Sequence, residues 1–106
     1  MEDKLTCVES NKPNRFYTCK LSEWLPRHKS RYQEYNFFKE KFNINSEIKF
    51  IKEREIIYLI LSEYEYKGIL FNIVVDLDYE FTEFIVKDES KVDIIRMLVE
   101  DTIREI

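Results

Sequence analysis

The sequence predicts an α+β fold in a single domain: an antiparallel four-stranded sheet packed with an N-terminal and a C-terminal helix, in the order α-β-β-β-β-α. Short apolar segments separated by turn residues fill residues 47–87, which is the pattern of an antiparallel meander. Apolar residues at three- and four-residue spacing flank this stretch on both sides, as in amphipathic helices. With 106 residues, 44% of them hydrophobic, the chain is long enough for one core, so we expect one compact domain, 1–106.

Residues 1–20 show neither helical nor alternating periodicity. The Asn11-Lys12-Pro13-Asn14 cluster is a turn signal. We therefore expect an irregular basic and polar arm, with residues 15–20 as a candidate short edge strand.

A helix is predicted over residues 22–43. Ser22 is a favourable N-cap residue. Pro26 lacks the amide that would close the first turn, so either that turn is distorted or the regular helix begins near Pro26. Aromatic residues recur at helical spacing and predict one buried stripe: Tyr32, Tyr35, Phe38 and Phe42.

The antiparallel meander is predicted over residues 47–87. Its four strands are expected at residues 47–52, 56–64, 69–76 and 80–87. The first turn is placed at the charged residues 52–55. The second is a hairpin at residues 65–68, where Gly68, the only glycine, can adopt a positive φ.

The last helix is predicted over residues 90–106. Ser90 and Asp93 stand three residues apart, as in a capping box. The apolar residues that follow keep to one helical face: Val92, Ile95, Leu98, Val99, Thr102, Ile103 and Ile106.

The two inner strands are apolar on both faces, because Ile56–Leu61 is an unbroken apolar run and Asn72 alone interrupts Ile69–Val75. A sheet with one wet face would instead alternate apolar and polar residues. Three arrangements would cover the second face: the helices on opposite faces, the N-terminal arm folded across it, or a partner protein.

Composition argues against an enzyme. Phosphate-binding loops and nucleophile elbows depend on glycine, and this chain has one; it also has one histidine. We expect no catalytic residues, no metal site and no cofactor. Two cysteines are too few for a disulfide framework, and no apolar run approaches the roughly 18 residues that span a bilayer. These features predict a soluble cytoplasmic protein that does not bind membranes.

Tyrosines and carboxylates gather around the predicted hairpin ends. Tyrosine is favoured at interface hot spots, and carboxylates would match a basic partner. The residues predicted to bind a partner are Tyr58, Glu63, Tyr64, Glu65, Tyr66, Asp76, Asp78, Tyr79, Glu80 and Glu83.

The net charge of −4 is unevenly distributed, because residues 12–41 carry eight Lys or Arg against three Asp or Glu. A basic segment with interleaved aromatic residues is typical of nucleic-acid binding. The candidate contacts for this alternative are Lys12, Arg15, Lys20, Arg27, Lys29 and Arg31. The same charges could contact the acidic half of a second copy, which would give a homodimer.

In overall type, though not by any residue motif, this small acidic chain with skewed composition resembles phage-encoded inhibitors of host defence, including anti-CRISPR-like proteins, and bacterial immunity proteins. The resemblance implies a non-catalytic protein-binding module that blocks a larger, basic, nucleic-acid-binding enzyme through an acidic, tyrosine-rich surface. The alternative is a small nucleic-acid-binding accessory protein that uses residues 12–41.

Overall fold

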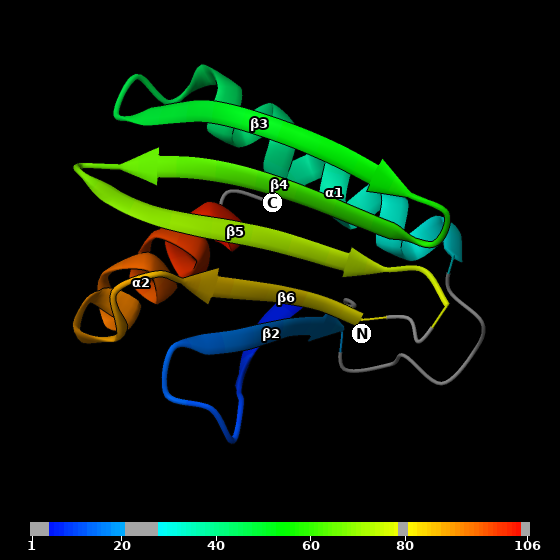
Figure 1. Cartoon of the computed structure of the whole chain (residues 1–106), viewed down its shortest axis with the longest axis horizontal. Coiled ribbons are helices and arrows are strands. Elements are labelled where there is room, and N and C mark those ends of the chain that lie inside the picture. Colours follow the sequence, from blue (N-terminus) through cyan, green and yellow to red (C-terminus); the bar gives the residue numbers. More distant parts are fainter. Residues whose placement is uncertain (1–4, 21–27, 79–80, 105–106) are drawn as a thin grey trace.

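The computed structural model describes residues 5–20, 28–78 and 81–104, and six antiparallel strands form one sheet in the order β1-β2-β6-β5-β4-β3 (Figure 1). The α+β class is confirmed, but the sheet has six strands rather than four. The strands are β1 (Leu5–Glu9), β2 (Arg15–Lys20), β3 (Ile48–Ile56), β4 (Leu59–Tyr66), β5 (Ile69–Asp76) and β6 (Phe81–Val86). The helical segments are α1 (His28–Ile44), the short 3-10 segment η1 (Glu89–Lys91) and α2 (Val92–Ile103).

The expected irregular arm is instead a hairpin that widens the sheet. β1 pairs with β2 around the predicted turn at residues 11–14, and β2 pairs with β6, so β2 is an inner strand rather than an edge. Phe16 and Thr18 are buried on the core side of β2. β1 has a partner on one side only, and a short edge strand need not show strong apolar alternation.

The expected turn at residues 52–55 is wrong, because these charged residues lie within β3. The chain reverses two residues later, at Ile57 and Tyr58, so Ile56 ends β3 and Leu59 begins β4. β3 is an edge strand with an irregular register between Phe50 and Lys52, and all its residues after Ile48 are exposed. Charged side chains are common on such edges, where they discourage unwanted pairing.

Both helices are present where the apolar spacing predicts them. The described part of α1 begins at His28; Ser22 and Pro26 lie outside the described residues. α2 begins at Val92 rather than residue 90, because Asp88 accepts a hydrogen bond from the Ser90 amide at 3.1 Å and starts η1 before it. The buried residues of the two stripes include Tyr35, Phe38 and Phe42 in α1, and Ile95, Leu98, Val99 and Thr102 in α2. Neither described helix is long and apolar enough to cross a membrane.

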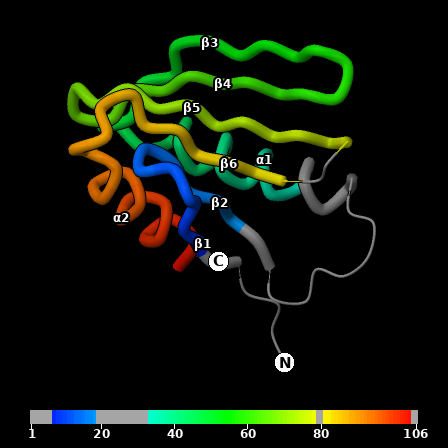
Figure 2. The backbone as a smooth tube through the Cα atoms, turned by 60° about the horizontal axis from the view of Figure 1, so that its bottom comes forward, coloured from blue at the N-terminus to red at the C-terminus, as the bar shows by residue number. Residues whose placement is uncertain are grey.

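The two helices pack side by side on the same face of the sheet (Figure 2). Phe84, at the centre of that face, is stacked on Phe16 with ring centroids 5.2 Å apart and meets the edge of Phe38 from α1 at the same distance. On the α2 side, the Arg96 guanidinium lies 5.5 Å from the Phe16 ring centroid, and its Nη1 is 3.4 Å from Glu9.

Two of the three expected ways to cover the second face are therefore wrong. The helices do not lie on opposite faces, and residues 5–20 extend the sheet sideways instead of crossing it. No helix or strand of the described residues lies over the face that points away from α1 and α2 (Figures 1 and 2).

The substitution Phe84→Ala tests the aromatic centre of the core. It removes a fully buried ring that contacts both β2 and α1, so we expect the free energy of unfolding to fall by about 3–5 kcal/mol, measured by urea denaturation. Phe50→Ala is the matched control: its ring is half-exposed at the sheet edge, and we expect a loss of about 1 kcal/mol. Equal losses in the two variants would contradict the packing described.

A polar contact also fixes α1 to the edge strand. The Tyr35 hydroxyl donates a hydrogen bond to Glu53 Oε1, and Lys39 Nζ lies 3.0 Å from the same oxygen. The hydrogen bond from Tyr35, and with it Lys39, lowers the pKa of Glu53 below its ordinary value of 4.5. Burial, followed by the bond to Glu53, raises the pKa of Tyr35 above its ordinary value of 10.

This contact predicts a pH dependence of stability. Because the folded-state pKa of Glu53 is lowered, its contribution is complete above the unfolded value of 4.5 and is lost as the pH falls through the folded value. We expect wild type to exceed Glu53→Gln in unfolding free energy by up to about 1 kcal/mol at neutral pH, with the difference shrinking in acid. Urea denaturation across this range measures it. The exposed Glu55, two residues along β3, provides the control Glu55→Gln; an equal acid-sensitive difference there would argue against this assignment.

Candidate protein-binding face

The face of the sheet opposite the helices, called the open face below, is built from alternate residues of the strands. On β4 and β5 the residues turned toward the helices are buried, except Tyr66 and Ile69 beside the hairpin, and those between them are half-buried. Antiparallel pairing places opposite residues on the same face. Leu61, for example, lies opposite Val74, which lies opposite Glu83 on β6. The described apolar and aromatic side chains of the open face are Val8, Tyr17, Ile56, Leu59, Leu61, Leu70, Val74, Phe81 and Ile85.

Charges on the open face are balanced. Three of its four cations lie on the edge strand β3 and face β4, where Lys52 Nζ is 3.6 Å from Glu63. The cations are Arg15, Lys49, Lys52 and Arg54, and the acids are Glu63, Glu65, Asp76 and Glu83. The predicted acidic surface is therefore a mixed-charge surface over most of the sheet.

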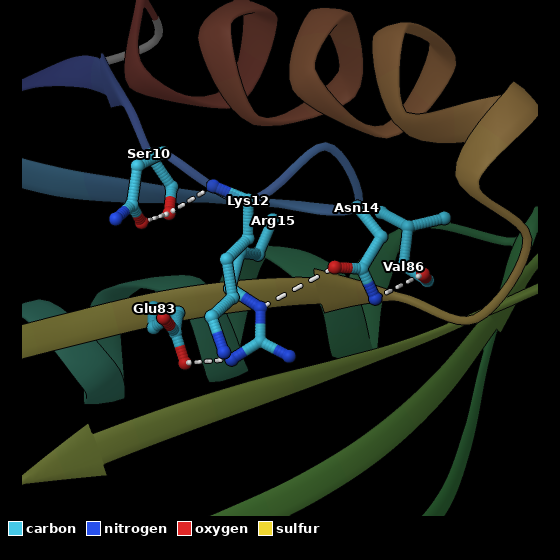
Figure 3. A network of polar contacts seen from close by, with 7 residues as sticks. Ser10, Lys12, Asn14, Arg15, Glu83 and Val86 are labelled. Carbon is cyan, nitrogen blue, oxygen red and sulfur yellow. Dashed lines mark hydrogen bonds and ion pairs between the residues drawn. The ribbon is translucent and has the colours of Figure 1, made fainter.

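Glu83 is the most buried of these acids, at 6% exposure, and it is held by neighbours on β2. Arg15 Nη1 lies 3.6 Å from Glu83, and Arg15 Nε donates to Asn14 Oδ1 at 3.4 Å (Figure 3). A hydrogen bond to Glu83 is the main cause that raises the pKa of Tyr17. Glu83 thus has partners within the chain, which makes it a supporting residue of the open face rather than a free contact.

The other residues predicted to bind a partner do not form one patch. Tyr58 is 60% exposed in the β3–β4 turn, and Asp76 and Asp78 lie at the same end of the sheet, where the Leu77 amide donates to the Tyr58 carbonyl at 2.7 Å. Glu65 lies near the other end of β4, on the open face. Tyr66 lies there too, but opposite Ile48 on the helix side.

Tyr64 is not available to a partner. Its side chain is fully buried beneath α1, with its ring centroid 5.4 Å from that of Phe42. Burial raises the pKa of Tyr64 to about 12. Tyr79 and Glu80 lie outside the described residues.

The structure describes only part of the set of basic residues proposed for nucleic-acid binding. Lys12 lies in the β1–β2 turn and Lys20 at the opposite end of β2. Arg15 lies between them and is paired with Glu83. Arg27 lies outside the described residues, as do the side chains of Lys20, Lys29 and Arg31. Of this set, the structure describes the side chains of Lys12 and Arg15 alone, so the nucleic-acid surface stays a prediction.

The most prominent features of the open face were absent from the predicted contacts. Leu61 and Val74, which are paired, and Ile85, which lies opposite Asn72 and diagonal to Val74, form its apolar centre; the apolar runs predicted such a face, but not which residues would point into it. Ile57 is the most exposed of the large apolar residues described, at 88%, and no turn signal in the sequence marks its position.

Among the described residues, no group of three or more His, Cys, Asp or Glu side chains could hold a metal ion. Comparisons of the chain with protein-family models, with curated proteins and with solved structures give no match.

Proposed function

We propose that this chain is a non-catalytic binding module that docks its open face against a larger protein in the cytoplasm and thereby inhibits or masks it. The observation that supports this proposal is the position of the helices: both cover one face, while the other keeps an apolar centre of Leu61, Val74 and Ile85. Apolar patches that extend over several strands are typical of protein interaction sites.

The charges favour a partner other than a second copy. If two open faces met about an axis across the strands, β3 would lie over β3, and its three cations would face the same three cations. If the axis ran along the strands instead, β3 would lie over β1. The acid of β1, Glu9, is opposite Phe16 and therefore lies on the helix side, where it cannot face these cations. Neither arrangement brings acids against these cations. A mixed-charge surface on a different protein could match both signs.

The acidic residues near the β3–β4 turn favour a partner that is basic at this end of the interface. Asp76 and Asp78 lie beside Tyr58 at this end, while the nearest open-face cation on β3, Arg54, stands opposite Leu61. A partner with basic groups there, such as the channel of a nucleic-acid-binding enzyme, would be attracted. The inhibitory role follows if docking covers such a channel.

The substitution Val74→Lys tests the open face. Lysine at this half-buried position opposite Glu83 can extend into solvent, so we expect an unchanged fold by circular dichroism but at least about tenfold weaker binding. The chain serves as bait in a lysate of cells that express it; retained proteins are purified, and their affinities are measured by calorimetry. Met97→Lys is the control, because Met97 is 63% exposed on α2, away from the open face.

Equal affinity of wild type and Val74→Lys would contradict the proposed interface. A wild-type dimer in sedimentation equilibrium that Val74→Lys dissociates would assign the open face to self-association instead. Micromolar binding to mixed DNA and RNA that falls steeply with added salt would favour the nucleic-acid alternative.

A further inference from the structure

The β3–β4 turn is strained. Ile57 and Tyr58 form a two-residue connection between Ile56 and Leu59, which are paired, and Ile57 has a φ of +43°. Positive φ at a β-branched residue is a genuine outlier, because the branched side chain crowds the backbone in this region. Two-residue hairpins normally place Gly, Asn or Asp at such positions.

The second two-residue hairpin of the same sheet shows the contrast. Lys67 and Gly68 connect β4 to β5 with φ values of +50° and +81°. No neighbouring atom lies within 4 Å of the position that a Gly68 Cβ would occupy, so glycine suits this position because of the backbone conformation and not because of limited space. Glycine thus occupies one of the two turn positions at this end of β4, and the other holds an unbranched lysine, whereas the opposite end places a β-branched residue at positive φ.

The strained turn holds three consecutive large apolar side chains in solvent. Ile56 is 41% exposed, Ile57 88% and Tyr58 60%. The hydrogen bond from the Leu77 amide to the Tyr58 carbonyl ties the turn to the β5–β6 connection, and the Asp78 amide donates to Asp76 there at 2.9 Å. The apolar tip is thus fixed in place with carboxylates beside it. Neither local backbone preference nor solvation explains an isoleucine at this position.

We propose that Ile57 and Tyr58 anchor the interface by entering an apolar pocket of the partner protein whose rim is basic opposite Asp76 and Asp78. This inference rests on the proposed function and names the residues that dominate it. Interface energy is concentrated in a few apolar or aromatic anchors that fill pockets, and a tyrosine beside a rigid turn loses little entropy on binding. The backbone strain supports such a role, since strained backbone conformations cluster at functional sites.

A membrane is a poorer occupant for the same tip. Ile and Tyr side chains suit a bilayer interface, but Asp76 and Asp78 at the same end of the sheet would be repelled by anionic headgroups. The tip carries no cation of its own between Ile56 and Leu59. The observations favour a protein pocket.

The substitution Ile57→Asn separates strain from binding, because the two effects have opposite signs. Asparagine tolerates positive φ, so we expect the urea midpoint of unfolding to rise. It also removes the apolar anchor, so we expect affinity for the purified partner to fall by about 30-fold or more. Ile57→Leu, which keeps an apolar side chain, should retain affinity within about threefold. Lys67→Asn introduces asparagine at the corresponding positive-φ position of the other hairpin and should leave affinity unchanged.

Each outcome is decisive. If Ile57→Asn binds as tightly as wild type while Val74→Lys does not, the open face is the interface and Ile57 is not its anchor. If neither substitution weakens binding, the proposed function fails as well. A lower urea midpoint of unfolding in Ile57→Asn than in wild type would show that the turn is not strained. Wild type that co-sediments with vesicles of phosphatidylcholine and phosphatidylserine, and loses this binding in Ile57→Asn, would assign the tip to lipid instead.

Discussion

The arrangement of the whole chain depends on packing both helices against one face of the sheet. A helix is about 10 Å wide and neighbouring strands are about 4.8 Å apart, so two helices side by side span roughly the width of four strands. The β1–β2 hairpin adds two strands beside β6, and α2 packs against β1 there, while Phe16 from β2 joins Phe84 and Phe38 in the aromatic centre. A four-stranded sheet would have left α2 without its contact to β1. As a result, none of the described elements covers the second face of the sheet.

Much of the fold was predictable from local patterns. The aromatic stripe of α1, the apolar stripe of α2, β5 and the Gly68 hairpin all follow from periodicity or turn chemistry in which local preference agrees with the fold. The β1–β2 hairpin was not predictable in this way, because short strands near a sheet edge bury few side chains and leave a weak alternating signal. The charges at residues 52–55 resembled a turn, although an exposed edge strand accepts them equally well.

The candidate site was predictable only in part, for a different reason. The apolar runs imply two apolar faces, but which face the helices leave open depends on contacts distant in sequence, such as Phe38 with Phe84. Tyr58 was proposed because of its residue type and is exposed, whereas Tyr64, equally suitable by type, is buried. Ile57 escaped notice because isoleucine contradicts the turn it occupies. Where a local rule is broken without a structural reason, a functional one becomes the better explanation.

The exposure of the open face is the central claim, and methyl NMR with a soluble gadolinium chelate measures it directly. The chelate broadens methyl signals that solvent can approach. We expect strong broadening at Leu59, Leu61, Val74 and Ile85, and little at their neighbours on the helix side, Ile60, Ile73, Val75 and Val86. Equal protection of the two sets would show that the open face is covered in the free protein, and would contradict the account of the fold and the proposal built on it.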